Sequence, residues 1–158
     1  SLAITNSMVD VFNNTFVGTA DSTGIDVSSL ENKTVNIENN IIAGQTTGVI
    51  SSSNPDGLDN LTVDYNMLQT LTADYDENIT PLAGPNNLTG MSPEFLQPSD
   101  LVGMGDYRLA LTSPAVDAGI DLGVSEDLKG NPRDTVPDIG AYEYESPVNI
   151  VISDWTVY

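Results

Sequence analysis

The chain has 158 residues, enough for one domain with a hydrophobic core, and carries 23 acidic against 4 basic residues, a formal net charge of −19. This acidity excludes a nucleic-acid-binding surface, which needs Lys and Arg to neutralise phosphates, and no apolar run reaches the roughly 20 residues of a transmembrane helix. Because the chain has no His and no Cys, it has no thiol nucleophile and no Ser-His-Asp triad. Any bound metal is expected to be a hard cation held by oxygen ligands, above all Ca²⁺.

An internal repeat runs through the first half of the chain. Three segments share its pattern: 11–18 (VFNNTFVG), 37–44 (IENNIIAG) and 63–68 (VDYNML). Their alignment puts Asn14, Asn40 and Asn66 in phase. A second, slightly shorter repeat links residues 23–29 with residues 47–53. Such repeats are typical of architectures in which one supersecondary unit stacks on the next.

The repeat predicts an all-β solenoid, a right-handed parallel β-helix of about three regular coils whose equivalent strands stack about 4.8 Å apart. Asn14, Asn40 and Asn66 are expected at the corner between two sheets, where Asn tolerates a left-handed backbone and stacked amides hydrogen-bond from coil to coil. The in-phase apolar residues are expected to form interior ladders: Val9, Val11, Phe16, Val35, Ile37, Ile42, Val63 and either Met67 or Leu68. The alternative, an antiparallel sandwich, would place strands roughly every 8–12 residues without the longer repeat.

We expect a single domain with coils in residues 1–70, and an irregular coil with a C-terminal cap in residues 71–146. One short strand is expected near Ile79. Residues 147–158 form a β-prone tail that fits no further coil. It is either the first strand of a following domain or a strand that pairs with a neighbouring subunit. Its apolar positions are Val148, Ile150, Ile152 and Trp155.

The second half carries a longer motif. Its segments are SPEF at 92–95, DYRL at 106–109, SPAVDAG at 113–119, DLKGNPR at 127–133 and PDIGAYEY at 137–144. This series resembles the C-terminal segment of many bacterial surface and secreted proteins with a right-handed parallel β-helix. The resemblance implies that fold and an extracellular or cell-surface location of bacterial or archaeal type. The family includes adhesin-like proteins, cell-wall-anchored proteins and polysaccharide-degrading enzymes, so it implies no single chemistry.

The motif is expected to cap the solenoid, because an open end exposes strand edges and core side chains. Arg108 and Arg133 lie within it. Both are expected to pair with Asp117, Asp138 or Glu143 and so to fix loops over the last coil. Binding of a substrate carboxylate is the alternative role of these arginines.

The residues that could carry catalysis are few. A β-helix polysaccharide lyase needs a Lys or Arg as Brønsted base, and only Lys33, Lys129, Arg108 and Arg133 are present, three of them in the cap motif. No pair of carboxylates stands out for glycoside hydrolysis among so many acids. We therefore assign no catalytic residue.

Calcium is the metal that the acidic loops would suit. Asp74, Asp76 and Asn78 have the D-x-D-x-N opening of an EF-hand loop, but Ile79 replaces the required Gly and Pro85 stands in the place of the bidentate Glu. The loop is therefore not an EF-hand, and could bind Ca²⁺ only as an irregular acidic site. The pairs Asp56/Asp59 and Asp117/Asp121 are alternatives.

These features predict a non-catalytic extracellular structural or adhesive module that associates head to tail, with residues 147–158 reaching the next subunit. Cell-surface glycans are the other partner considered. One alternative function is the C-terminal fragment of a secreted polysaccharide lyase or glycosidase. The other is a carbohydrate-binding surface that uses Tyr65, Tyr75 or Trp155.

Overall fold

The computed structural model describes residues 8–28, 33–51, 60–98 and 105–145. The elements are β1 (Met8–Phe12), β2 (Thr15–Val17), β3 (Thr23–Asp26), β4 (Thr34–Glu38), β5 (Ile41–Ala43), β6 (Thr47–Ile50), β7 (Leu61–Asp64), β8 (Met67–Gln69), β9 (Ala73–Tyr75), the 3₁₀-helix η2 (Thr80–Leu82), β10 (Leu88–Thr89), β11 (Phe95–Gln97) and β12 (Asp106–Leu109). Among these residues there is no helix long and apolar enough to cross a membrane.

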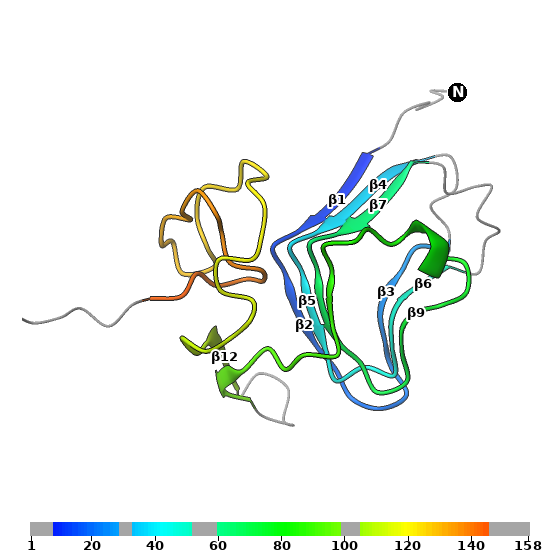
Figure 1. The fold of residues 1–158 in the computed structure, drawn as a ribbon, viewed down its shortest axis with the longest axis horizontal. Coiled ribbons are helices and arrows are strands. Elements are labelled where there is room, and N and C mark those ends of the chain that lie inside the picture. Colours follow the sequence, from blue (N-terminus) through cyan, green and yellow to red (C-terminus); the bar gives the residue numbers. More distant parts are fainter. Residues whose placement is uncertain (1–7, 29–32, 52–59, 99–104, 146–158) are drawn as a thin grey trace, which may run out of the picture.

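The strands stack in three parallel sheets, with the orders β1-β4-β7, β2-β5-β8-β10 and β3-β6-β9 (Figure 1). Each coil contributes one strand to each sheet, and Val9, Val35 and Leu61 lie side by side in the first sheet, in phase with the sequence repeat. The predicted parallel β-helix of about three coils is therefore confirmed.

The coil interior is filled by aliphatic side chains that point in from all three sheets. Its buried members are Val27, Val35, Ile37, Ile42, Val49, Val63, Leu68 and Ile79. Leu68, rather than its neighbour Met67, belongs to this interior ladder. Ile79 also enters the interior, but from a turn just before η2 and not from the strand expected near it.

The repeated Thr-Gly pair of β3 and β6 reflects a close contact between coils. A Cβ atom on Gly24 would lie 2.6 Å from the carbonyl oxygen of Gly48, and one on Gly48 would lie 2.4 Å from that of Asp74. No side chain fits at such distances, so the second sequence pattern marks a place where only glycine allows the coils to stack.

The C-terminal segment, residues 91–98 and 105–145, packs beside the coils rather than over the last one (Figure 1). Its hairpin β11-β12 is antiparallel, and the loops that follow carry Ala115 and Ile139 to the outer face of the β2-β5-β8-β10 sheet. There these residues meet Ile41 and Met67, which point away from the coil interior. The expectation of a cap over the last coil is wrong, because this sheet is apolar on both faces and its outer face must also be covered.

The end of the stack at β7, β8 and β9 is partly covered by a shorter turn of the chain. Ala83 forms a parallel bridge with Val63, and β10 pairs with β8. Leu82, at the end of η2, packs against the interior cluster. Residues 79–89 therefore cover this end of the stack. The sequence motif had led us to expect that role of the C-terminal segment.

Candidate functional site

A ladder of asparagine side chains runs along the corner between the first two sheets. The Nδ2 of Asn14 donates to Oδ1 of Asn40 at 3.1 Å, Asn40 donates to Asn66 at 3.0 Å, and Asn66 donates to Asn87 at 3.2 Å. Each acceptor oxygen also receives the backbone N–H of the preceding ladder residue, as in Asn40 N to Asn66 Oδ1 at 3.0 Å. Sequence reasoning missed Asn87, because the last turn is shorter than the others and places this residue out of phase with the repeat.

The left-handed backbone at this corner belongs to the residue before each ladder asparagine. The φ angles are +53° at Asn13, +56° at Asn39 and +53° at Tyr65. The expectation that Asn14, Asn40 and Asn66 adopt this conformation is wrong. One residue turns the chain and the next supplies the amide, which explains why the repeat contains Asn-Asn twice.

Within the described ranges, the first coil forms an open end of the stack. In each sheet its strand, β1, β2 or β3, is an edge strand with a neighbour on one side only among the described residues. Val9, Val11 and Phe16 are only partly buried there, whereas the residues that pair with them in the second coil are buried. Leu2 and Ile4, together with the tail residues Val148, Ile150, Ile152 and Trp155, lie outside the described residues.

The C-terminal segment is held together by a buried ion pair. The Nη1 of Arg133 lies 2.8 Å from Oε2 of Glu143, with side chains 4 % and 10 % exposed. The Nη2 of Arg133 donates to the carbonyl oxygen of Gly140 at 2.8 Å. Arg108 does not pair with any of the three expected carboxylates, because Asp106, two residues away on the same strand, binds its guanidinium at 2.6 Å.

Asp138 and Asp117 meet in this segment through the backbone. The backbone N–H of Asp117 donates to Oδ1 of Asp138 at 2.8 Å, and the backbone N–H of Tyr144 donates to Oδ2. Burial raises the pKa of Asp138, and burial together with Asp138 raises the pKa of Glu143. These carboxylates therefore work as acceptors that fasten loops to one another.

The proposed calcium residues are all engaged in hydrogen bonds within the chain. Oδ1 of Asp74 accepts the hydroxyl of Thr70 at 2.8 Å, while Asp76 accepts the backbone N–H of Ser51 at 2.7 Å and that of Ile79 at 2.9 Å. Asn78 donates its amide to the carbonyl oxygen of Ser51 at 2.6 Å. The described part of the chain contains no group of three or more His, Cys, Asp or Glu that could hold a metal ion.

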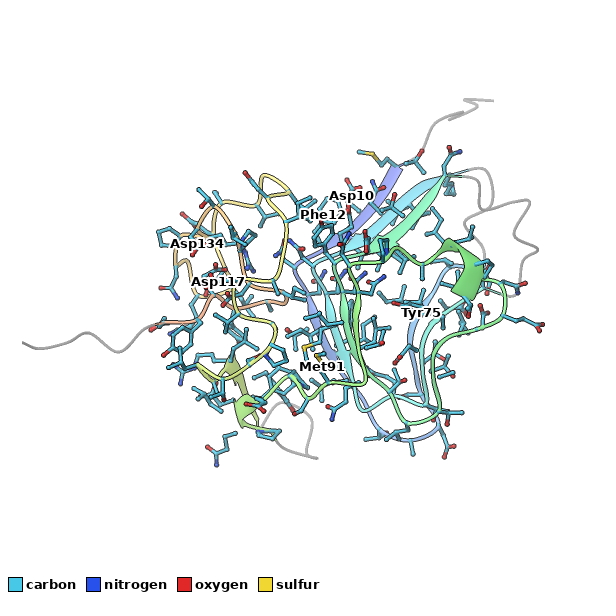
Figure 2. The ribbon with its side chains drawn as sticks, viewed as in Figure 1. Asp10, Phe12, Tyr75, Met91, Asp117 and Asp134 are labelled. Carbon is cyan, nitrogen blue, oxygen red and sulfur yellow. The ribbon has the colours of Figure 1, made fainter. Side chains whose placement is uncertain are left out.

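Tyr75 does not offer a sugar-stacking surface. Its side chain packs against the interior cluster, inside the space that the three sheets enclose (Figure 2), and its hydroxyl group is buried. Its position follows from the register, since Tyr75 pairs with the buried Val49 of the preceding coil. Tyr75 therefore does not suit the carbohydrate-binding alternative, whose other candidates are Tyr65 and Trp155.

Three carboxylates lie near one another on the outer side of the first sheet. Glu38 pairs in register with Asp64, and Asp10 lies on the neighbouring strand β1. Burial first, then repulsion from Asp64 and Asp10, raises the pKa of Glu38. Asp64 is fixed by the backbone N–H and the amide of Asn86, both at 2.8 Å. A carboxyl of raised pKa beside a fixed carboxylate is the type of pair that glycoside hydrolysis uses.

Most of the basic residues are held in ion pairs, which makes them less suited to act as the Brønsted base of a lyase. Arg108, Arg133 and Lys129 form ion pairs with Asp106, Glu143 and Glu145 inside the C-terminal segment. Lys33 is the fourth cation and lies directly before β4.

In comparisons with known proteins, the chain matches no protein-family model and no curated protein.

Proposed function

We propose that this chain is a non-catalytic structural or adhesive module that works outside the cell and extends by stacking one β-helix on another. The observation that carries the proposal is the first coil, where, among the residues that the structure describes, all three sheets end at the same side with partly exposed apolar side chains. Exposed edge strands are templates for pairing with another chain, and proteins that remain monomeric cover or block them. The resemblance of residues 92–144 to bacterial surface proteins supports the extracellular location.

Stacking of this kind requires that the two surfaces in contact differ. The first coil offers open edges, whereas the opposite end is partly covered by residues 79–89. A contact between unlike ends produces a filament when the rotation between subunits does not close a ring. The tail, residues 147–158, is proposed as the strand that completes this contact between subunits.

The test places a charge inside the open coil. Val11 points inward at the end coil, while Met8 on the same strand points outward and is 64 % exposed. Val11→Lys and Met8→Lys make the same change of charge on β1, so Met8→Lys is the matched control. Light scattering over a concentration series should show association in the native chain and in Met8→Lys, and monomers in Val11→Lys.

Two further measurements complete this test. Circular dichroism should show that Val11→Lys keeps its β-structure, and deletion of residues 147–158 should weaken association without changing the fold. A native chain that stays monomeric at high concentration, or a Val11→Lys variant that associates as well as the control, would refute the proposal.

The group of carboxylates that includes Glu38 favours one second candidate function, that of a glycosidase. The raised pKa of Glu38 suits the general acid of such an enzyme. If this candidate is right, release of reducing ends from a polysaccharide panel should be lost in Glu38→Gln. Asp26→Asn is the control, because Asp26 lies in another sheet and its carboxylate binds the nearby Ser28 of its own turn. Absence of any release by the native chain would leave the structural function as the better account.

A further inference from the structure

A cavity of about 480 Å³ lies between the corner of the first coil and the C-terminal segment. Asn13 contributes the wall from the coil, and the loops 120–125 and 133–137 contribute the opposite wall. The two parts are joined next to it, since the Nδ2 of Asn39 donates to the carbonyl oxygen of Ile120 at 2.7 Å and Oδ1 of Asn39 accepts the N–H of Ile120 at 3.0 Å. The cavity therefore has a fixed frame on both sides, and its volume is within the range of about 300–1,000 Å³ that ligand sites occupy.

Two buried hydrogen-bond donors on residues that line this cavity have no acceptor within the described part of the chain. They are the Nδ2 of Asn13, a residue 8 % exposed, and the Nε of Arg133, whose side chain is 4 % exposed. The other guanidinium nitrogens of Arg133 are used, by Glu143 and by the carbonyl oxygens of Asp138 and Gly140. Native proteins rarely leave buried donors without a partner, because each costs free energy. The two donor atoms are themselves closed off from solvent, so a ligand oxygen reaches them only when the neighbouring side chains shift. Two such donors on residues that line one cavity point to a ligand that brings oxygen acceptors.

The same cavity also presents acceptors. Asp121 uses Oδ1 to bind the backbone N–H of Gly123 at 2.9 Å, and Asp134 uses Oδ1 to bind that of Val136 at 2.9 Å. In each carboxylate these bonds leave the second oxygen able to accept from a ligand. Apolar walls between the polar groups come from Ile120, Leu122, Val124 and Pro137.

This mixture of groups selects the chemical class of the ligand. An anion would meet two carboxylates in a chain of net charge −19. A metal ion would lie beside a residue that carries a positive charge, Arg133, and the described residues provide no group of acids able to hold one. A hydroxyl group both donates and accepts, so it can satisfy the amide and guanidinium N–H groups as well as the carboxylates. The C–H face of a sugar ring fits the apolar walls.

We propose that this cavity binds a neutral sugar residue through Asn13, Arg133, Asp121 and Asp134. The site is separate from the open edges of the first coil. Sugar binding therefore does not depend on self-association, and a chain that remains monomeric can still bind.

The test is an NMR titration of the ¹⁵N-labelled chain with neutral probes: glucose, galactose, mannose, N-acetylglucosamine and the disaccharides cellobiose and maltose. Sodium galacturonate and calcium chloride serve as charged comparisons. The neutral probe that binds should shift the amide signals of residues 120–125 and 133–135 in a saturable way. Binding by galacturonate or by Ca²⁺ in place of every neutral sugar at these residues would overturn the proposed ligand class.

Two pairs of variants separate loss of the site from loss of the fold. Asn13→Gly removes the amide and keeps the left-handed backbone. Asp21→Gly is its control, because Asp21 is another polar residue with a left-handed backbone (φ +68°) and does not line the cavity. Asp134→Asn removes the charge and keeps an oxygen for its turn, and Asp26→Asn does the same in β3, far from the cavity.

Asn13→Gly and Asp134→Asn should each weaken binding roughly three- to tenfold, the effect of losing one or two hydrogen bonds. The two control variants should bind as the native chain does. The proposal fails if no neutral sugar binds at millimolar concentration, or if Asn13→Gly and Asp134→Asn bind as tightly as their controls.

Discussion

Replacing Asn66 with alanine tests how much the asparagine ladder contributes to stability. Asn66 is fully buried, and its side chain accepts two hydrogen bonds from Asn40 and donates to the carbonyl oxygens of Ile37 and Asp64 and to Asn87. The left-handed residue at this corner is the preceding one, so alanine at position 66 adds no backbone strain. The variant therefore measures the loss of the amide and little else.

The expected magnitude follows from the groups that lose their partners. The buried backbone N–H of Asn40 would lose its acceptor, at about 1–3 kcal/mol, whereas the amide of Asn40 keeps the carbonyl oxygens of Val11 and Glu38 as acceptors. The carbonyl oxygens have further lone pairs and should contribute less. A total of about 3 kcal/mol is a large share of the roughly 5–15 kcal/mol typical of a domain, and should lower Tm by about 6–12 °C for a chain of this size.

Asn14→Ala is the matched control, because it removes the same side chain at the exposed end of the ladder. Its amide donates to the carbonyl oxygen of Phe12 and to Asn40, but water can replace it there. We expect a loss below about 1 kcal/mol. Urea unfolding followed by circular dichroism measures both variants. Equal losses at the two positions, or a loss below about 1 kcal/mol for Asn66→Ala, would refute this account of the ladder.

Three other predictions concern charged groups. Because the pKa of Glu38 is raised in the folded chain, its ionised form destabilises the fold above that pKa, so Glu38→Gln should be more stable at pH 7 by up to about 1 kcal/mol and equal to the native chain at pH 3. Arg133→Met leaves a buried carboxylate unpaired and should cost about 3–5 kcal/mol in thermal unfolding, whereas the exposed Arg108→Met should cost less than about 1 kcal/mol. Asp76→Ala should lower Tm by the same amount in EDTA and in calcium chloride, because the carboxylate binds backbone N–H groups; a larger loss in calcium would favour a metal site.

Much of the candidate surface depends on contacts that no local pattern contains. The cavity at Asn13 is formed by residues of the first coil and of the C-terminal segment, which approach only because that segment packs on the outer side of a sheet. Arg108, by contrast, pairs with a residue close in sequence. Its guanidinium binds Asp106, two residues away, and not the more distant carboxylates that the motif led us to expect. A sequence lists the charges, but the distances between them decide which pairs form.

The coil length, the parallel stacking and the aliphatic interior were determined by the sequence alone, because a β-solenoid repeats the same local geometry in every coil and each copy must bury the same positions. The same repeat predicted that Asn14, Asn40 and Asn66 stack at one corner and hydrogen-bond from coil to coil. Only the tertiary structure decided which neighbour of each ladder asparagine turns the chain and how the shortened last turn brings Asn87 into line. It also decided that the C-terminal segment covers a face of the stack and not its end. The physical reason is that the outward residues Ile41 and Met67 look, in sequence, like any other apolar positions of a strand, and only the folded sheet shows which side they occupy.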